Sequence, residues 1–347
     1  MHMGLRVSLP ALTVLATAIS VAAFQAGTPP DPRASYEATV GPARTDLPQW
    51  PFPNDPMKGL PAIVPDDGQP QHVPGSDKAL TIKQIESFGA ADWFPDAHPK
   101  APVTVIDGKP GEYFSCGSCH LMNGYGSPES QGINGLPVAY MRQQFEDFKN
   151  GLRHTSVVER LDYHMMRTTV HLSEADPKLT TDALEYFHSL GPAAKWIRVV
   201  EAESVPKTMP GPNGLAAPDP SGAKEPIGNR IIEVPDNYNR SRLHDPTSGY
   251  VAYVPRGSLK KGAALVKTGA GGGSMACVAC HGTDLRGMGD TVPPIAGRSP
   301  IATGRQLYDF KTGARHGKDS ALMMPAVEKL TDQDIVDISA YLASLPQ

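Results

Sequence analysis

The chain of 347 residues has only four cysteines, no strong charge of one sign and no second long apolar run. Lys and Arg number 32 against 36 Asp and Glu, which gives a formal net charge of −4 at pH 7. This mild acidity argues against a nucleic-acid partner. Beyond an apolar run at 7–21, no segment is long and apolar enough to cross a bilayer. We expect any membrane association to come through partners or through that first run.

The four cysteines form two short motifs. Each motif has two cysteines three positions apart, followed at once by a histidine: Cys116, Cys119 and His120 in the first, and Cys277, Cys280 and His281 in the second. On one helical turn the cysteines can reach the two vinyl groups of a haem while the histidine points at the iron. A redox dithiol or half of a zinc site would also use such a pair, but neither explains the histidines. We expect two covalently attached haem c groups, with His120 and His281 as iron ligands.

The N-terminus has the pattern of an export signal. Arg6 precedes the apolar run, and Ala22 and Ala23 follow it. A positive start, an apolar core and small residues at the end are typical of a bacterial signal peptide. A permanent anchor is the alternative, although the run is short for a span of ~20 residues. We predict cleavage after Ala23 and a periplasmic protein.

Prolines crowd residues 24–77, which excludes long helices and central strands and predicts an extended arm. The arm either stays disordered or lies across a haem domain. Trp50, Phe52 and Ile63 favour docking, because they would bury apolar area.

An internal repeat follows each motif. Residues 147–154 and 309–316 match at six of eight positions, at an offset of 162 against 161 for the cysteines. We therefore predict a mostly α-helical chain with two tandem copies of one haem domain. Helices are expected at 78–88, at 259–267 ahead of the second motif, and at 331–345, where Thr331 is the N-cap and Asp334 the third residue. The predicted organisation is a signal peptide at 1–23, an arm at 24–77, haem domains at 78–190 and 258–347, and a linker at 191–257.

The linker holds many Pro and Gly residues and two β-like runs at 230–234 and 250–254, which predict a small hairpin. We interpret the linker as a strap that packs the two domains together. A partner-binding element is the alternative.

The sixth iron ligand separates electron carriers from enzymes, since methionine stabilises Fe(II) and an open site binds small molecules. A methionine doublet holds the same place in both copies: Met165 and Met166 in the first, and Met323 and Met324 in the second. Methionines that only fill the core are the alternative. The repeat does not say which methionine of a pair binds, and His164 competes in the first copy. A second histidine there would give a lower potential.

A ligating histidine normally donates its other N–H to a carbonyl that fixes the ring. Pro293 is placed to offer that carbonyl in the second copy. Counting back from the repeat puts Gln131 at the matching place in the first copy.

Residues 115–345 resemble the two-domain dihaem cytochromes c related to cytochrome c4, in which each half has the class I cytochrome fold. The resemblance rests on the two haem motifs, on 293–297, on Gln306 to Phe310 and on the methionine-to-helix ending. It implies the axial pairs His120/Met165 and His281/Met323. Members of that family shuttle electrons in the periplasm, commonly towards a terminal oxidase.

These observations predict an electron carrier, not an enzyme, with redox proteins as its partners. One alternative is a dihaem enzyme of the peroxidase or thiosulfate-oxidising type, which needs an accessible iron beside an acid/base residue. Another is the cytochrome subunit of a dehydrogenase.

Overall fold

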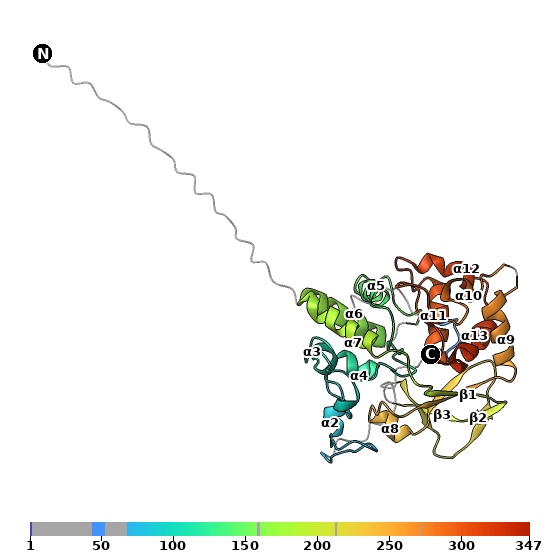
Figure 1. The fold of residues 1–347 in the computed structure, drawn as a ribbon, viewed down its shortest axis with the longest axis horizontal. Coiled ribbons are helices and arrows are strands. Elements are labelled where there is room, and N and C mark those ends of the chain that lie inside the picture. The colour runs from blue at the N-terminus through green and yellow to red at the C-terminus, as the bar shows by residue number, and fades with distance from the viewer. Residues whose placement is uncertain (2–43, 53–67, 158–159, 212–213, 272) are drawn as a thin grey trace. The chain divides into compact units, whose positions relative to one another are not determined.

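The computed structural model describes Met1 and residues 44–52, 68–157, 160–211, 214–271 and 273–347. The predicted signal peptide, much of the arm and Ile63 lie outside these ranges. The described part is mostly helical, as predicted, and none of its helices is long and apolar enough to cross a membrane. Figure 1 shows the helices of the first copy in cyan and green and those of the second in orange and red.

The first copy contains six α-helices and a 3-10 turn within the described residues: α2 (Ile82–Ile85), η1 (Pro95–Ala97), α3 (Val103–Ile106), α4 (Cys116–His120), α5 (Val138–Lys149), α6 (Arg160–Glu174) and α7 (Pro177–Ser189). The helix predicted at 78–88 is only four residues long. It begins late because Leu80 pairs through its backbone with Gln71, and Thr81 then caps the helix.

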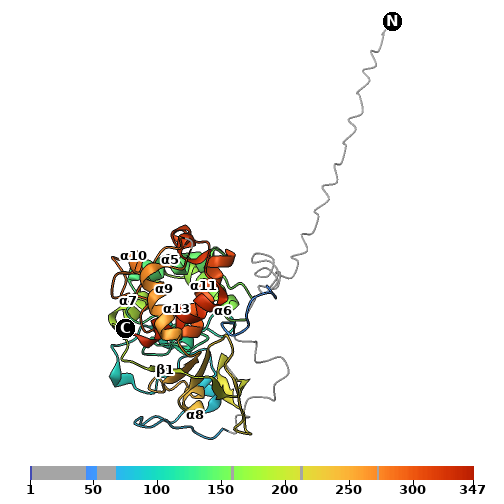
Figure 2. The same cartoon turned by 90° about the vertical axis from the view of Figure 1, so that its right-hand side faces the viewer.

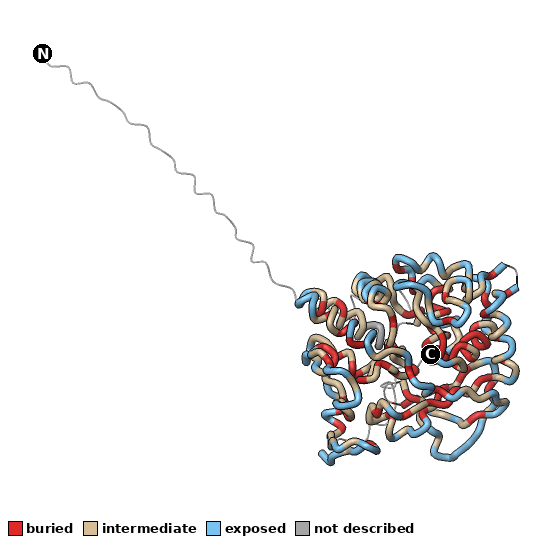
Figure 3. The backbone as a smooth tube through the Cα atoms, viewed as in Figure 1, coloured by how far each residue is buried: buried red, intermediate tan, exposed pale blue. Residues whose placement is uncertain are grey.

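The second copy follows the prediction more closely. Its helices are α9 (Ser258–Thr268), α10 (Val278–His281), α11 (Pro300–Thr312), η3 (Ser320–Leu322), α12 (Met324–Val327) and α13 (Asp332–Ser344). Thr331 and Asp334 form the expected capping box at the start of α13. Its apolar face is buried, and Figure 3 shows long buried stretches of α11 and α13. Helix α9 crosses α13 at Gly262, where a side chain would clash with the Asp337 carbonyl.

The two copies differ around the methionine doublet. In the second copy Leu330 directly precedes the cap of the last helix, as expected. In the first copy the matching Leu172 lies inside α6, and α7 begins only at Pro177, so Leu172 does not open the last helix. The reason is local: Pro325 follows the second doublet and starts a new short helix, whereas Arg167 after the first doublet lets α6 continue.

The linker folds into a sheet with strand order β1-β7-β6, formed by β1 (Ile197–Glu201), β7 (Tyr250–Val254) and β6 (Ile232–Pro235). Strands β6 and β7 pair antiparallel, which confirms the predicted pairing, although α8 (Tyr238–Arg242) lies between them in the chain. Strand β1, which pairs parallel to β7, was not predicted from the sequence. Two small ladders join β2 (Ser204–Pro206) to β5 (Lys224–Pro226) and β3 (Thr208–Pro210) to β4 (Ala216–Pro218).

The linker contacts both copies, as a strap would. Trp93 of the first copy donates from Nε1 to the Leu243 carbonyl at 2.7 Å. On the other side, Val254 packs with Val336 of α13 in one apolar cluster. Figure 2 shows β1 and α8 below the helices of the second copy.

Residues 44–52 of the arm dock on the second copy, whereas residues 68–77 pack on the first copy through Val73, which shares an apolar cluster with Trp93. Phe52 is 1% exposed and lies in the same core as Tyr308, with ring centroids 6.1 Å apart. Trp50 packs against Gly304 of α11, where no side chain would fit beside it. The expectation that Trp50 and Phe52 favour docking is therefore confirmed.

Candidate haem-binding sites

The first motif lies on a single short helix. Ser115 caps α4 by accepting a hydrogen bond from the Ser118 backbone N–H, so Cys116, Cys119 and His120 share one helical turn and a half. In the second motif Cys277 is the cap of α10, which ends at His281. Both helices end in the same unusual backbone turn: Leu121 has φ 61° and ψ 162°, and Gly282 has φ 82° and ψ 160°. The two motifs therefore present their cysteines and histidine in the same local geometry.

Each histidine ring is held by a backbone carbonyl. The Nδ1 of His120 donates to the Gln131 carbonyl at 2.8 Å, and that of His281 donates to the Pro293 carbonyl at 2.8 Å. Both bonds are those predicted from the sequence. Because a carbonyl can only accept, the proton sits on Nδ1, and Nε2 is available to bind iron.

Both imidazoles are held in the neutral form. Burial lowers the pKa of His120 to about 4. The charge of Arg153 also lowers this pKa, whereas the hydrogen bond to the Gln131 carbonyl raises it. Burial also lowers the pKa of His281, helped by Arg315. A neutral imidazole is the form that ligates a metal.

The cysteines do not fit the rival chemistries. They form no disulfide, and burial raises the pKa of Cys116 to about 12 and that of Cys277 to about 11. A redox dithiol needs the opposite shift, because the thiolate is its reactive form. Within the described ranges, no three His, Cys, Asp or Glu side chains come together in a metal-binding group.

The methionines predicted as sixth ligands do not lie on the helices that carry the haem motifs. Met323 stands between η3 and α12, and both it and Met324 pack against the core of the second copy. Met165 lies on α6 on the same face as Thr169 and Leu172, four and seven positions on, which are 0% and 2% exposed. Its neighbour His164 points elsewhere and packs edge-on against Phe114, with ring centroids 5.1 Å apart.

The repeated segments contact each other, which the sequence analysis missed. Arg153 and Arg315 pair as an antiparallel bridge, and each donates to two glutamines, one in either copy. Arg153 lies over the Phe148 ring at 4.5 Å and Arg315 over the Phe310 ring at 4.2 Å. His154 and His316, which hold the last position of each repeated segment, pack against each other. The sequence could have indicated this contact, because both repeated segments contain the same arginine and the same phenylalanine.

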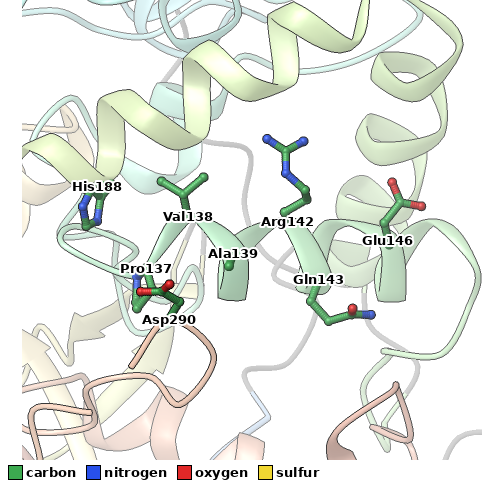
Figure 4. Close-up of a pocket in the computed structure, with 8 residues that line it drawn as sticks. All are labelled: Pro137, Val138, Ala139, Arg142, Gln143, Glu146, His188 and Asp290. Carbon is green, nitrogen blue, oxygen red and sulfur yellow. The ribbon is translucent and has the colours of Figure 1, made fainter. Parts of the chain in front are cut away.

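Two hollows lie away from the predicted ligands. A groove of about 610 Å³ runs along α5, with Arg142 and Glu146 on that helix and with His188 and Asp290 beside Pro137 at its end (Figure 4). A cleft of about 870 Å³ lies between the loop after His120 and the linker, and its walls include Tyr125 and Trp196. Neither hollow is lined by a cysteine or histidine of the haem motifs.

Comparison with known proteins points to one family. Residues 259–346 match the family "Cytochrome c". Cytochrome c-554(548) of Halomonas halodenitrificans is 41% identical over 68 residues, which are 20% of this chain and 82% of the relative. The thiosulfate dehydrogenase electron acceptor of Thiomonas intermedia is 24% identical over 267 residues, 76% of this chain and 91% of the relative. Cytochrome c4 of Stutzerimonas stutzeri is 30% identical over 140 residues, 36% of this chain and 65% of the relative.

The residues present fit a covalently attached haem: each copy offers two thiols, a neutral histidine with its Nε2 available, and a carbonyl that fixes the ring. The expectation of haem c in both copies agrees with the relatives named above. This chain belongs to the cytochrome c family.

Proposed function

We propose that this protein is a periplasmic dihaem electron carrier that passes single electrons between redox partners in a respiratory chain. The haems attach at Cys116 and Cys119 and at Cys277 and Cys280. The axial pairs are His120/Met165 and His281/Met323. The observation that carries the proposal is the repeated histidine site, in which Nδ1 donates to a carbonyl at 2.8 Å in both copies.

Haem c supplies a one-electron Fe(III)/Fe(II) couple when it is bound. The contribution of the chain is to keep each iron ligand still. The His281 ring is buried, the His120 ring is half-buried, and both are hydrogen-bonded to a carbonyl. Met323 packs in a core shared with α9, α11 and α13. Fixed ligands change little when the iron gains an electron, which suits a carrier.

The contact between the copies supports electron exchange between them. Arg153 and Arg315 follow the haem motifs at matched positions and affect the pKa values of His120 and His281, respectively. Both arginines lie where the two copies meet. This supports a route for electrons between the two histidine sites across that interface.

The electron donor in this proposal is a dehydrogenase. Two relatives named as thiosulfate dehydrogenase electron acceptors, from Thiomonas intermedia and Stutzerimonas stutzeri, align over 76% and 67% of this chain. The export signal expected at 1–23 supports the periplasm as the place of exchange.

A redox titration of the purified holoprotein tests the proposal. We expect two haems at positive potentials, the ferric methionine-to-iron charge-transfer band, and no binding of carbon monoxide to the reduced protein. Carbon monoxide binding at either haem would contradict a carrier, because it requires an open or weakly held sixth position.

The second candidate is a dihaem enzyme in which His164 replaces Met165 at the first iron. The contact of His164 with Phe114, two residues before Cys116, favours it. In that case one haem would titrate at a much lower potential than the other and would lack the methionine band.

A further inference from the structure

The two histidine-fixing carbonyls sit in backbones of different stiffness. In the second copy Pro293 supplies the carbonyl and Pro294 follows it, so two rings fix φ on either side of that peptide. In the first copy Gln131 supplies it and Gly132 follows, the most permissive residue of all. The backbone at this peptide is therefore freer in the first copy than in the second, although hydrogen bonds within the first copy hold the residues around it.

Two arginines of the second copy add a restraint on this backbone. On the C-terminal side of Gln131, Arg298 donates to the Gly132 carbonyl at 3.2 Å, and to the Asn134 side-chain and backbone oxygens at 3.0 Å each. On the N-terminal side, Arg305 donates to the Pro128 carbonyl at 3.2 Å and the Glu129 carbonyl at 2.7 Å. The loop is thus held on both sides of the residue that orients His120.

Burying these charged guanidinium groups costs free energy, which argues that their contacts do more than hold the copies together. Arg298 is 4% exposed and Arg305 is 9% exposed, and the acceptors of these hydrogen bonds are uncharged oxygens. Burial lowers the pKa of Arg298 to about 10, so its charge persists at neutral pH. The acceptors of Arg298 are all uncharged, so burying its charge is expensive, whereas its forked guanidinium fixes geometry well. Arg305 lies near the buried carboxyl of Glu233.

We propose that Arg298 is a positioning residue for the first haem: reaching from the second copy, it fixes the loop whose Gln131 carbonyl orients His120, and so sets the potential of the first haem alone. Arg305 holds the other side of the same loop. The inference rests on the proposed function in one respect, the attachment of both haems.

The effect has a direction. A firm hydrogen bond from His120 Nδ1 to a carbonyl makes the imidazole a better electron donor and favours Fe(III). When the loop loosens, that bond weakens and the potential of the first haem rises. The second haem does not respond, because the prolines fix its carbonyl.

The test is Arg298→Lys in the holoprotein, which keeps the charge but loses the fork. We expect an upward shift of the first haem's potential in a redox titration, and altered hyperfine-shifted proton resonances of that haem only. The control is Ser156→Ala, which removes a hydrogen bond to Asp309 of 2.8 Å elsewhere in the same interface. It should leave both potentials in place.

A rescue variant separates positioning from simple docking. Gln131→Pro gives the first copy the second copy's residue, and combined with Arg298→Lys it should return the first potential towards the parent value. If Arg298→Lys does not fold, Arg305→Lys should raise the same potential by loosening the other side of the loop.

The inference is overturned if Arg298→Lys shifts both potentials equally, or moves neither, or if Ser156→Ala shifts the first haem as much. A failure of the proposed function looks different. In that case the parent protein would hold fewer than two haems by haemochrome absorbance, or would bind carbon monoxide, before any arginine is changed.

Discussion

Each methionine doublet offers two neighbouring sulfurs, and only one of them can bind the iron. Single substitutions can therefore identify the ligand. We predict that Met323→Leu removes the methionine-to-iron band of the second haem. It should also lower that haem's potential by on the order of tenths of a volt, within the range that axial ligands span. Met324→Leu is the matched control, because both side chains pack on the same core. If Met324→Leu loses the band and Met323→Leu keeps it, then Met324 is the iron ligand and Met323 is not.

A buried carboxylate in the linker predicts a pH effect on stability. Glu233 is 3% exposed on β6 and accepts a hydrogen bond of 2.6 Å from Ser299, the cap of α11. Burial raises its pKa to about 7 from 4.5, so the folded protein keeps a proton there that the unfolded chain loses. Stability from this group is therefore complete below pH ~4.5 and is lost as the pH rises through ~7, by at most about 3 kcal/mol.

Glu233→Gln should remove this loss of stability at higher pH. Between pH 5 and pH 8 in urea unfolding, we expect the free energy of unfolding of the variant to rise relative to that of the parent protein, since its amide does not ionise. Glu203→Gln, at an exposed position of the same linker, should leave the pH dependence as it is. Parallel curves for the parent and Glu233→Gln would rule out Glu233 as the source.

At the scale of elements, the crossing of α9 and α13 holds the second copy together. Gly262 has no room for a Cβ beside the Asp337 carbonyl. We predict that Gly262→Ala costs about 2 kcal/mol or more, because the helices must move apart. Thermal unfolding of the holoprotein measures it. Gly271→Ala, whose added carbon would meet nothing within 4 Å, should change stability little.

The elements that the sequence predicted correctly are those fixed by local signals. Helix α13 has its cap, its acidic third residue and its apolar spacing within fifteen residues, and the β6 and β7 runs are rich in β-branched and aromatic side chains. The extent of α6 was harder to predict, because both copies contain the same Met-Met pair. In the second copy Pro325 follows the pair, whereas in the first copy Arg167 follows it and the helix continues. Strand β1 depends on a partner more than fifty residues away, which no local pattern reveals.

The histidine sites were predictable for the same reason, since the histidine and its carbonyl lie 11 positions apart in the first copy and 12 in the second. The arginines that hold the first loop were not. Arg298 and Asn134 are 164 positions apart, and only the folded chain brings them together.

At the scale of the whole molecule, Phe52 of the arm is part of the core of the second copy. We predict that Phe52→Ala lowers the free energy of unfolding by about 3 kcal/mol, since a buried aromatic ring leaves a cavity. Thermal unfolding of the holoprotein checks this. Gln49→Ala, three residues earlier and exposed, should stay within about 0.5 kcal/mol of the parent. If Phe52→Ala also stayed within about 0.5 kcal/mol of the parent, the docked ring would contribute little to stability.

The docked arm also bears on folding kinetics. The Pro51 carbonyl accepts a hydrogen bond from Arg305, 254 positions further along the chain. Closing so long a loop raises the contact order, and high contact order slows folding. Residues 44–52 therefore wait for α11 and α13 to be synthesised before the core that they share can form.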